Sequence, residues 1–207
     1  MIFSRPPDGA QIFALVFLGN PGRQYEQTRH NAGRLLVPYL NYFFTWQKKF
    51  KGNFAKITRL DGSINKTLCF LEPETYMNLS GESVAGLVCY YKIPYENILV
   101  VHDELELELG QISLKFGGGL GGHKGLRSIK ASLNSADFWR LRIGIGRPPG
   151  EKNKTSVSDW VLSCFSMEES VKLKLVLEHC AAAVEKFVTE GPQTLLPEWN
   201  KINILAA

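Results

Sequence analysis

Ile12-Phe-Ala-Leu-Val-Phe-Leu18 is an unbroken apolar run that leads directly into Gly19-Asn-Pro-Gly-Arg-Gln-Tyr-Glu-Gln-Thr-Arg-His-Asn31. A short apolar run bounded by glycine and proline is typical of a strand buried on both faces. In an open α/β sheet, ligands bind beyond the carboxyl ends of such strands. We therefore expect the polar side chains that follow the run to lie at the mouth of a cleft: Asn20, Tyr25, His30 and Asn31.

Predicted strands and helices alternate along the rest of the chain. Strands are expected at 53–60, 66–71, 98–102, 111–116 and 139–145, and helices at 33–44, 80–91, 125–133 and after 166. Asp61-Gly62 is a hairpin signal between the first two of these strands. This alternation, with some neighbouring strands joined by hairpins, predicts an α/β fold around a mixed sheet.

Local signals define several boundaries. Ser80 is a candidate N-cap, and Ser166-Met-Glu-Glu169 is a capping box that opens a long helix. Pro38 is unfavourable inside 33–44 because proline lacks an N–H and clashes with the preceding turn, so that helix is expected to begin late or to kink. Residues 146–160 are rich in Pro, Gly and Lys and are expected to form a loop. The long helix has apolar residues at helical spacing at positions 173, 176, 177, 180, 184, 187 and 188.

The composition bounds the class of protein. The chain has 207 residues, of which 44% are hydrophobic and 21% charged, enough for one sizeable core. No apolar stretch approaches the roughly 18 to 20 residues of a membrane span, and residues 1–11 lack the apolar segment of a signal peptide. We expect a loose extension at 1–11 and a single domain at 12–207.

The cysteines give no sign of a metal site or a redox motif. None of the four has metal-ligand or CxxC spacing, and each lies among apolar neighbours: Cys69, Cys89, Cys164 and Cys180. Buried free thiols in a reducing cytoplasm are the favoured interpretation, and disulfide pairing is the alternative.

Basic residues concentrate in the middle of the chain. Residues 111–154 hold nine Lys and Arg against two acidic residues, a net charge of +7, so the rest sums to −3 within the total of +4. Such a concentration is typical of a surface that binds a polyanion. A solvated face without a partner is, however, the more common cause of a charge cluster.

One histidine is the best candidate for catalysis. His30 follows the first loop, and Asn20, Asn78 and Asp103 are expected near comparable strand ends. An adjacent carboxylate holds an imidazole in one tautomer and makes it a better general base. A lone loop histidine is more often a surface or hydrogen-bonding residue, so the hypothesis depends on these segments converging.

Other chemistries have weaker support. His102-Asp103-Glu104 could ligate a metal, but no HExxH helix or matching ligand spacing accompanies it. Gly81-Glu-Ser-Val-Ala85 departs from a nucleophile elbow at its fifth position. Gly117, Gly119 and Gly122 satisfy GxGxxG but follow a late strand, although such glycines free backbone N–H groups for phosphate. Because the chain offers no convincing serine or cysteine nucleophile, a hydrolase built on it would more naturally activate water.

The chain resembles the bacterial-type peptidyl-tRNA hydrolases from Ile12 to about residue 190. Six motifs stand in the family's order: Leu18-Gly-Asn-Pro-Gly22 with Tyr25, Thr28-Arg-His-Asn-Ala-Gly33, Tyr76-Met-Asn-Leu-Ser-Gly81, His102-Asp-Glu-Leu105, Gly121-Gly-His-Lys-Gly-Leu126 and Arg140-Leu-Arg-Ile-Gly-Ile-Gly146. The resemblance implies a monomeric, cytoplasmic α/β/α enzyme with a mixed twisted sheet. It implies hydrolysis of the ester between the peptide and the 3′ end of tRNA, without a metal or cofactor.

The same resemblance implies roles for individual residues. His30 would be the general base on water, Asp103 would orient it, and Asn20 would help to position the scissile carbonyl. Substrate-binding positions would be Tyr25, Tyr76, Met77, Asn78 and Lys124. The positions that resemble the family's tRNA contacts are Lys115, Arg142, Lys152 and Lys154.

One position departs from the family pattern. After His123 the family usually shows asparagine, whereas this chain has Lys124. An ammonium donates hydrogen bonds but cannot accept them, so Lys124 could instead meet a phosphate. Lys124 also favours a second hypothesis, a noncatalytic RNA-binding member of the fold like the splicing-factor relatives in plant organelles. A small-molecule esterase of unrelated mechanism is the third hypothesis.

Overall fold

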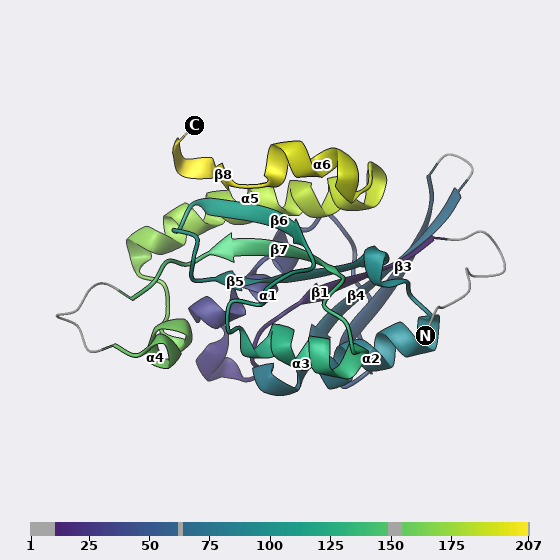
Figure 1. Ribbon diagram of the computed structural model, residues 1–207, viewed down its shortest axis with the longest axis horizontal. Coiled ribbons are helices and arrows are strands. Elements are labelled where there is room, and N and C mark those ends of the chain that lie inside the picture. The colour runs from purple at the N-terminus through teal and green to yellow at the C-terminus, as the bar shows by residue number, and fades with distance from the viewer. Residues whose placement is uncertain (1–10, 62–63, 149–154, 207) are drawn as a thin grey trace.

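The computed structural model describes residues 11–61, 64–148 and 155–206, which form an eight-stranded sheet between helical layers (Figure 1). The order of strands across the sheet is β2-β3-β4-β1-β5-β7-β6-β8. Their bounds are β1 Gln11–Phe17, β2 Gln47–Lys49, β3 Gly52–Asp61, β4 Ile64–Pro73, β5 Ile98–Glu104, β6 Gln111–Phe116, β7 Trp139–Gly144 and β8 Ile202–Asn203.

The apolar run that opens the chain lies at the centre of the sheet. β1 pairs in parallel with β4 on one side and with β5 on the other, and β7 continues the parallel set beside β5. β3 is antiparallel to β4, and β6 is antiparallel to β7, so the predicted mixed sheet is confirmed. Because β4, β1, β5 and β7 run in one direction, their carboxyl ends meet at one edge, where α/β proteins bind ligands.

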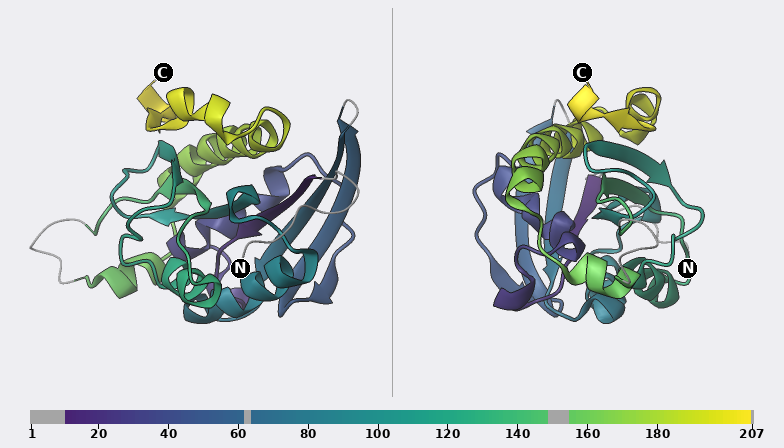
Figure 2. Two further views of the ribbon diagram at one scale, coloured as in Figure 1. Left: turned by 45° about the vertical axis from the view of Figure 1, so that its right-hand side comes forward. Right: turned by 90° about the vertical axis from the view of Figure 1, so that its left-hand side faces the viewer.

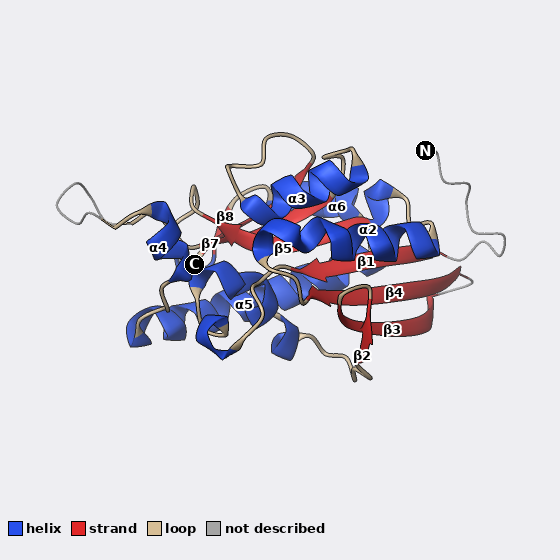
Figure 3. Cartoon of the chain, turned by 90° about the horizontal axis from the view of Figure 1, so that it is seen from below, coloured by secondary structure: helices blue, strands red, loops and turns tan. Residues whose placement is uncertain are grey.

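Helices cover both faces of this sheet. Their bounds are α1 Ala32–Leu35, α2 Ser80–Tyr91, α3 Lys124–Leu133, α4 Val157–Leu162, α5 Met167–Thr189 and α6 Pro192–Trp199. The two views of Figure 2 show α5 on one side of the sheet and α2 with α3 on the other. Figure 3, seen from the side of α2 and α3, shows both helices lying over β1 and β5. The arrangement confirms the three-layer α/β/α fold.

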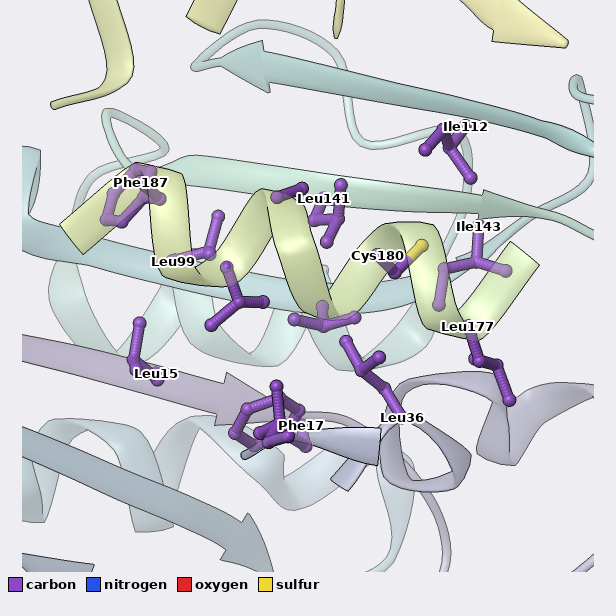
Figure 4. Packing of buried hydrophobic residues seen from close by; sticks show 14 of the residues in the cluster. Leu15, Phe17, Leu36, Leu99, Ile112, Leu141, Ile143, Leu177, Cys180 and Phe187 are labelled. Atoms are coloured by element: carbon purple, nitrogen blue, oxygen red, sulfur yellow. The ribbon is translucent and has the colours of Figure 1, made fainter. Parts of the chain in front are cut away.

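The side chains of β1 explain why both faces of the sheet are covered. Its odd-numbered residues from Phe13 to Phe17 pack in a cluster beneath α5 (Figure 4), and its even-numbered residues contribute to a second cluster beneath α2 and α3. All seven positions whose spacing predicted the buried face of α5 are buried. The Ser166–Glu169 capping box that opens α5 is also present.

Some expectations for the helices were wrong. The helix expected at 33–44 is reduced to α1, followed by a 3₁₀ turn at Val37–Tyr39, because Pro38 ends the regular hydrogen bonding. Ser80 does not cap α2; its hydroxyl donates to the carbonyl of Met77, and the N-cap residue is Leu79. Part of the loop expected at 146–160 is the short helix α4. The sequence analysis also missed β2, α6 and β8.

The expectation of buried cysteines is half right. All four cysteines are free thiols, but Cys69 and Cys180 are buried whereas Cys89 and Cys164 are exposed. Helical periodicity explains the exposure of Cys89, which lies on the outer side of α2.

Two predictions lie outside the described residues. The loose extension expected at 1–11 covers residues 1–10, and the proposed tRNA contacts Lys152 and Lys154 fall within 149–154. In the part of the chain that the structure describes, no helix is long and apolar enough to cross a membrane.

Candidate active site

A cavity of about 690 Å³ opens at the carboxyl edge of the parallel strands. A volume of this size is typical of sites that hold small molecules or parts of larger ones. Every catalytic and substrate-binding residue expected from the sequence lines it: Asn20, Tyr25, His30, Tyr76, Met77, Asn78, Asp103 and Lys124. These residues come from loops after β1 and β4, from the end of β5 and from the start of α3, so the expected convergence is found.

His30 and Asp103 form a buried hydrogen-bonded pair in this cavity. Nδ1 of His30 lies 2.9 Å from Oδ1 and 3.0 Å from Oδ2 of Asp103, and the two residues are only 8% and 3% exposed. A carboxylate can only accept, so Nδ1 of His30 carries a proton, and in the neutral ring Nε2 keeps its lone pair. The pair therefore presents an oriented imidazole base.

Gly33 lets this histidine segment approach the sheet closely. A Cβ on Gly33 would lie 2.5 Å from the carbonyl oxygen of Val101 and 2.7 Å from that of Leu18. Such contacts are too short for any side chain, so only glycine permits the 3₁₀ turn at Arg29–Asn31 to pack between β1 and β5. This packing brings His30 to the end of β5, where Asp103 lies.

His123 is a site residue that the sequence analysis did not single out. Its Nε2 lies 3.0 Å from Oδ1 of Asp103, while its Nδ1 accepts the backbone N–H groups of Gly125 and Leu126 as the N-cap of α3. Nδ1 is therefore unprotonated, and Nε2–H donates to Asp103. His123 and His30 consequently have opposite tautomers. The position of His123 close to the start of the helix predicted at 125–133 was the signal that could have found it.

Two imidazole N–H groups thus converge on one carboxylate. Burial alone would raise the pKa of Asp103, but His30 and His123 outweigh it through charge and hydrogen bonding and hold that pKa well below its usual range. The carboxyl group consequently stays ionised at neutral pH and fixes both rings.

Asn20 is held rigidly beside this trio. Its backbone N–H donates to Oδ1 of Asn31 at 2.8 Å, and Nδ2 of Asn31 donates back to the carbonyl of Asn20 at 3.0 Å. The side-chain Oδ1 of Asn20 accepts the N–H of Met77 at 2.8 Å. Because Oδ1 is used in this way, the Nδ2 donors are left for the cavity.

A metal site would need a different hydrogen-bond arrangement. One ligand atom each from His30, Asp103 and His123 lies within 4.8 Å of the others, so the trio could hold an ion. Binding through Nε2 of His123 would require the proton to move to Nδ1, which already accepts two N–H groups. The imidazole N–H groups of His30 and His123 are thus arranged for hydrogen bonding to Asp103.

His102 takes no direct part in this cavity. It is buried, its Nδ1 donates to the carbonyl of Asp103 at 2.6 Å, and its ring packs edge-on against His123 with centroids 5.0 Å apart. Burial and the neighbouring His123 lower the pKa of His102 well below its usual range. The consecutive ligand set His102-Asp103-Glu104 considered from the sequence is therefore not formed as a unit.

The basic residues expected to contact tRNA differ in their surroundings. Lys124 lines the cavity and is exposed, and Lys115 is exposed on β6. Arg142 is partly buried on β7, where its Nε donates to Oε2 of Glu104 at 2.9 Å. Arg140, on the same face of β7, is buried and donates to the carbonyls of Gly117 and Gly119, so it holds the glycine-rich loop.

Comparison with known proteins decides the family of the chain. The sequence model of the family "Peptidyl-tRNA hydrolase" matches residues 14–206. The chain belongs to the peptidyl-tRNA hydrolase family. The peptidyl-tRNA hydrolase of Treponema pallidum is 46% identical over 200 residues, covering 94% of this chain and 98% of that one. The peptidyl-tRNA hydrolase of Dichelobacter nodosus is 45% identical over 184 residues, covering 86% and 93%.

Solved structures of peptidyl-tRNA hydrolases agree with this assignment. The crystal structure of the Acinetobacter baumannii peptidyl-tRNA hydrolase superposes with a TM-score of 0.77 at 37% identity, covering 90% of this chain and 93% of that one. The family match over residues 14–206 includes both His30 and Asp103.

Proposed function

We propose that this member of the peptidyl-tRNA hydrolase family hydrolyses the ester between the peptide and the 3′ end of tRNA with His30 as the general base. The observation that carries this proposal is the His30–Asp103 pair, which is preformed inside the cavity with Nδ1 of His30 bonded to the carboxylate, so that Nε2 of the neutral ring is available as the base. The reaction recycles tRNA from peptide chains released prematurely.

His30 starts the reaction by taking a proton from water. Asp103 stabilises the imidazolium that forms and keeps Nε2 directed at the water. The resulting hydroxide attacks the acyl carbon, and the ester breaks when the ribose 3′ oxygen leaves with the proton from His30. His123 keeps Asp103 in place through the second N–H bond to the carboxylate.

Amide donors stabilise the negative charge that develops on the carbonyl oxygen. The Nδ2 group of Asn20 is preorganised because both of its neighbours, Asn31 and Met77, fix the asparagine. Preorganised donors of this kind stabilise the oxyanion without further rearrangement. Asn78 positions the peptide, and Tyr25, Tyr76 and Met77 line the same cavity.

Basic residues near the cavity hold the tRNA through its phosphates. Lys115 and Lys124 form no ion pair with any residue that the structure describes. Lys124 also begins α3, where the helix dipole disfavours a cation, whereas α2, α4 and α5 each carry an acid in their first turn. This unfavourable placement supports a phosphate partner for Lys124. Arg142, Lys152 and Lys154 are the other proposed contacts.

The remaining features of the proposal follow the family resemblance. Residues 12–207 act as one domain, the protein is a monomer, and neither a metal nor a cofactor takes part. The free thiols support a reducing cytoplasm as the location. Size-exclusion chromatography with light scattering tests the monomer, and unchanged turnover after exhaustive chelation tests the independence from metal.

Cleavage of an N-blocked aminoacyl-tRNA by the purified protein tests the proposed function. We expect release of the blocked amino acid, with a rate that falls as the salt concentration rises because phosphate contacts are screened. Binding of tRNA without cleavage would instead support the noncatalytic RNA-binding alternative. Cleavage insensitive to salt and to the tRNA body would support a small-molecule esterase.

A further inference from the structure

α4 forms an apolar wall of the cavity. Val157, Val161 and Leu162 line the cavity from this helix, and Val157 and Leu162 remain 44% and 40% exposed. Exposed apolar side chains beside a polar catalytic pair are covered most simply by the substrate. Figure 1 shows α4 beyond the carboxyl end of β7, apart from the helices that cover the faces of the sheet.

The side chain of Arg29 links this wall to the catalytic segment. Its guanidinium carbon lies 3.8 Å from the ring centroid of Trp160 in α4 and 4.9 Å from that of Phe165. Nη2 donates to both carboxylate oxygens of Glu169 at 2.9 Å, and Nη1 donates to the carbonyl of Cys164 at 3.3 Å. One side chain next to His30 therefore contacts α4, the turn after it and the start of α5.

Arginine is well suited to this set of contacts. The residue is only 4% exposed, and a buried charge is unfavourable unless it is paired and hydrogen-bonded. A planar guanidinium can stack on the indole of Trp160 and donate in its plane to Glu169 at the same time, whereas an ammonium cannot. Trp160 is fixed at its ring edge as well, because its Nε1 donates to the carbonyl of Gly146 at 2.8 Å.

The position of His30 does not depend on the Arg29 side chain. Backbone pairing joins Thr28 to Cys164, and the N–H of Arg29 donates to the carbonyl of Ser163 at 3.0 Å. Asn31, on the other side of His30, is bonded to Asn20. Changing the Arg29 side chain should therefore release the Trp160 side of α4, while these backbone bonds and the His30–Asp103 pair stay in place.

The order of strands indicates which part of the substrate meets α4. Tyr76, Met77 and Asn78 follow β4, which lies on one side of β1. Trp160 is bonded to Gly146 after β7, on the opposite side, and β7 and β6 carry Arg142 and Lys115. The peptide side of the ester thus belongs at the β4 end, and the nucleic-acid side belongs at the α4 end.

We propose that α4 is the subsite for the 3′-terminal nucleoside and that Arg29 is the positioning residue that holds this subsite at its distance from His30. This inference rests on the proposed function. Contacts to the nucleoside are made equally in the ground state and the transition state. Loss of Arg29 should consequently weaken substrate binding without slowing the chemical step.

Kinetics of Arg29→Lys and Val161→Ala on blocked aminoacyl-tRNA test the proposal. We expect KM to rise on the order of 10-fold in each variant, with kcat within about 2-fold of the wild type and an unchanged pH profile. Val171→Ala is the matched control, since Val171 is an exposed valine of α5 that does not line the cavity. A fall in kcat at constant KM would overturn the positioning role.

A double-mutant cycle tests whether Arg29 acts through α4. Combining Arg29→Lys with Val161→Ala should raise KM by clearly less than the product of the two single effects, because both changes disturb one contact. Equality with that product would contradict the proposal. Should Arg29→Lys fail to fold, the cycle uses Trp160→Phe, which retains an aromatic face but loses the bond to Gly146.

The choice of amino acid in the substrate tests the nucleoside assignment. The KM effects should be the same for glycyl and phenylalanyl esters, since the nucleoside is common to both. Effects confined to the phenylalanyl ester would assign α4 to the peptide and overturn the inference. Absence of cleavage by the wild type would refute the proposed function. Turnover by the wild type together with an unchanged KM in the variants would instead overturn only the assignment of α4.

Discussion

The His30–Asp103–His123 trio and the basic residues proposed to contact tRNA differ in how firmly each is held. His30, Asp103 and His123 are largely buried, and hydrogen bonds fix the orientation of each ring. Lys115 and Lys124 are exposed and form no ion pair with a described residue. Under the proposed mechanism, the difference teaches that preorganised groups supply the chemistry, whereas unpaired charges supply affinity. Substitutions in the two regions should therefore change different kinetic constants.

The largest effect is expected from His30→Ala. Removing the general base should lower kcat by about 10²–10⁴-fold, while the dissociation constant for tRNA changes little. Single-turnover cleavage together with a tRNA-binding assay measures the two quantities separately. Unchanged turnover would show that His30 is not the general base. Substitutions in the two regions would then no longer differ in the kinetic constant that they change.

Asp103→Asn should have a smaller effect on kcat, on the order of 10²-fold. The amide removes the negative charge that stabilises the imidazolium, yet the His30 ring is retained. The variant should also be less stable at neutral pH by about 1–3 kcal/mol, because one carboxylate oxygen is replaced by an NH2 donor beside the buried imidazole N–H groups. Urea unfolding measures this difference.

The stability difference should depend on pH. The pKa of Asp103 is lowered in the folded protein, so its contribution is present above the unfolded pKa of about 3.9 and is lost as the pH falls below it. The difference in the free energy of unfolding between the wild type and Asp103→Asn should therefore become smaller in acid. A gap that widens would contradict an ionised Asp103.

Lys124→Gln should affect binding alone. Loss of one phosphate contact should weaken tRNA binding several-fold and reduce the slope of log K against log[salt] by about 0.7–1, with kcat unchanged. Lys92→Gln is the control, because Lys92 is exposed at the far end of α2, about 18 Å along the helix from Ser80. Equal slopes for Lys124→Gln and the wild type would exclude a phosphate contact.

The smallest effect concerns the thiols, two of which are buried like the histidine pair and two of which are exposed like the lysines. Burial, opposed only partly by Lys56 and Lys49, raises the pKa of Cys69 to about 12, and burial also raises that of Cys180. Native protein at pH 8 should therefore react with iodoacetamide at Cys89 and Cys164 only, and at all four cysteines in urea. Mass spectrometry of the adducts checks the pattern.

The sequence predicted the centre of the fold because its signals are local. The apolar run of β1, the hairpin between β3 and β4 and the capping box of α5 each depend on neighbouring residues. The helix expected after His30 was overestimated because Pro38 interrupts it, and α4 was hidden in a segment rich in loop-forming residues. Apolar periodicity could not reveal a helix as short as α4.

The sequence anticipated which residues lie together where a motif carried them, and it missed residues whose contacts are distant along the chain. His30, Asp103 and Asn20 converge as expected. The role of His123 depends on a bond to a residue 20 positions away and on a cap that fixes its tautomer. Arg29 reaches Glu169 across 140 positions, and no local pattern signals such a contact.

The imidazole tautomers test the central claim most directly, because the account assigns a different ring nitrogen to each histidine. The chain has four histidines, and ¹⁵N NMR of histidine-labelled protein at pH 8 reports which nitrogen of each neutral ring is protonated. We predict the Nδ1–H form for His30, bonded to Asp103, and the Nε2–H form for His123. An Nε2–H form of His30 would leave no lone pair facing the cavity and would contradict its role as the base.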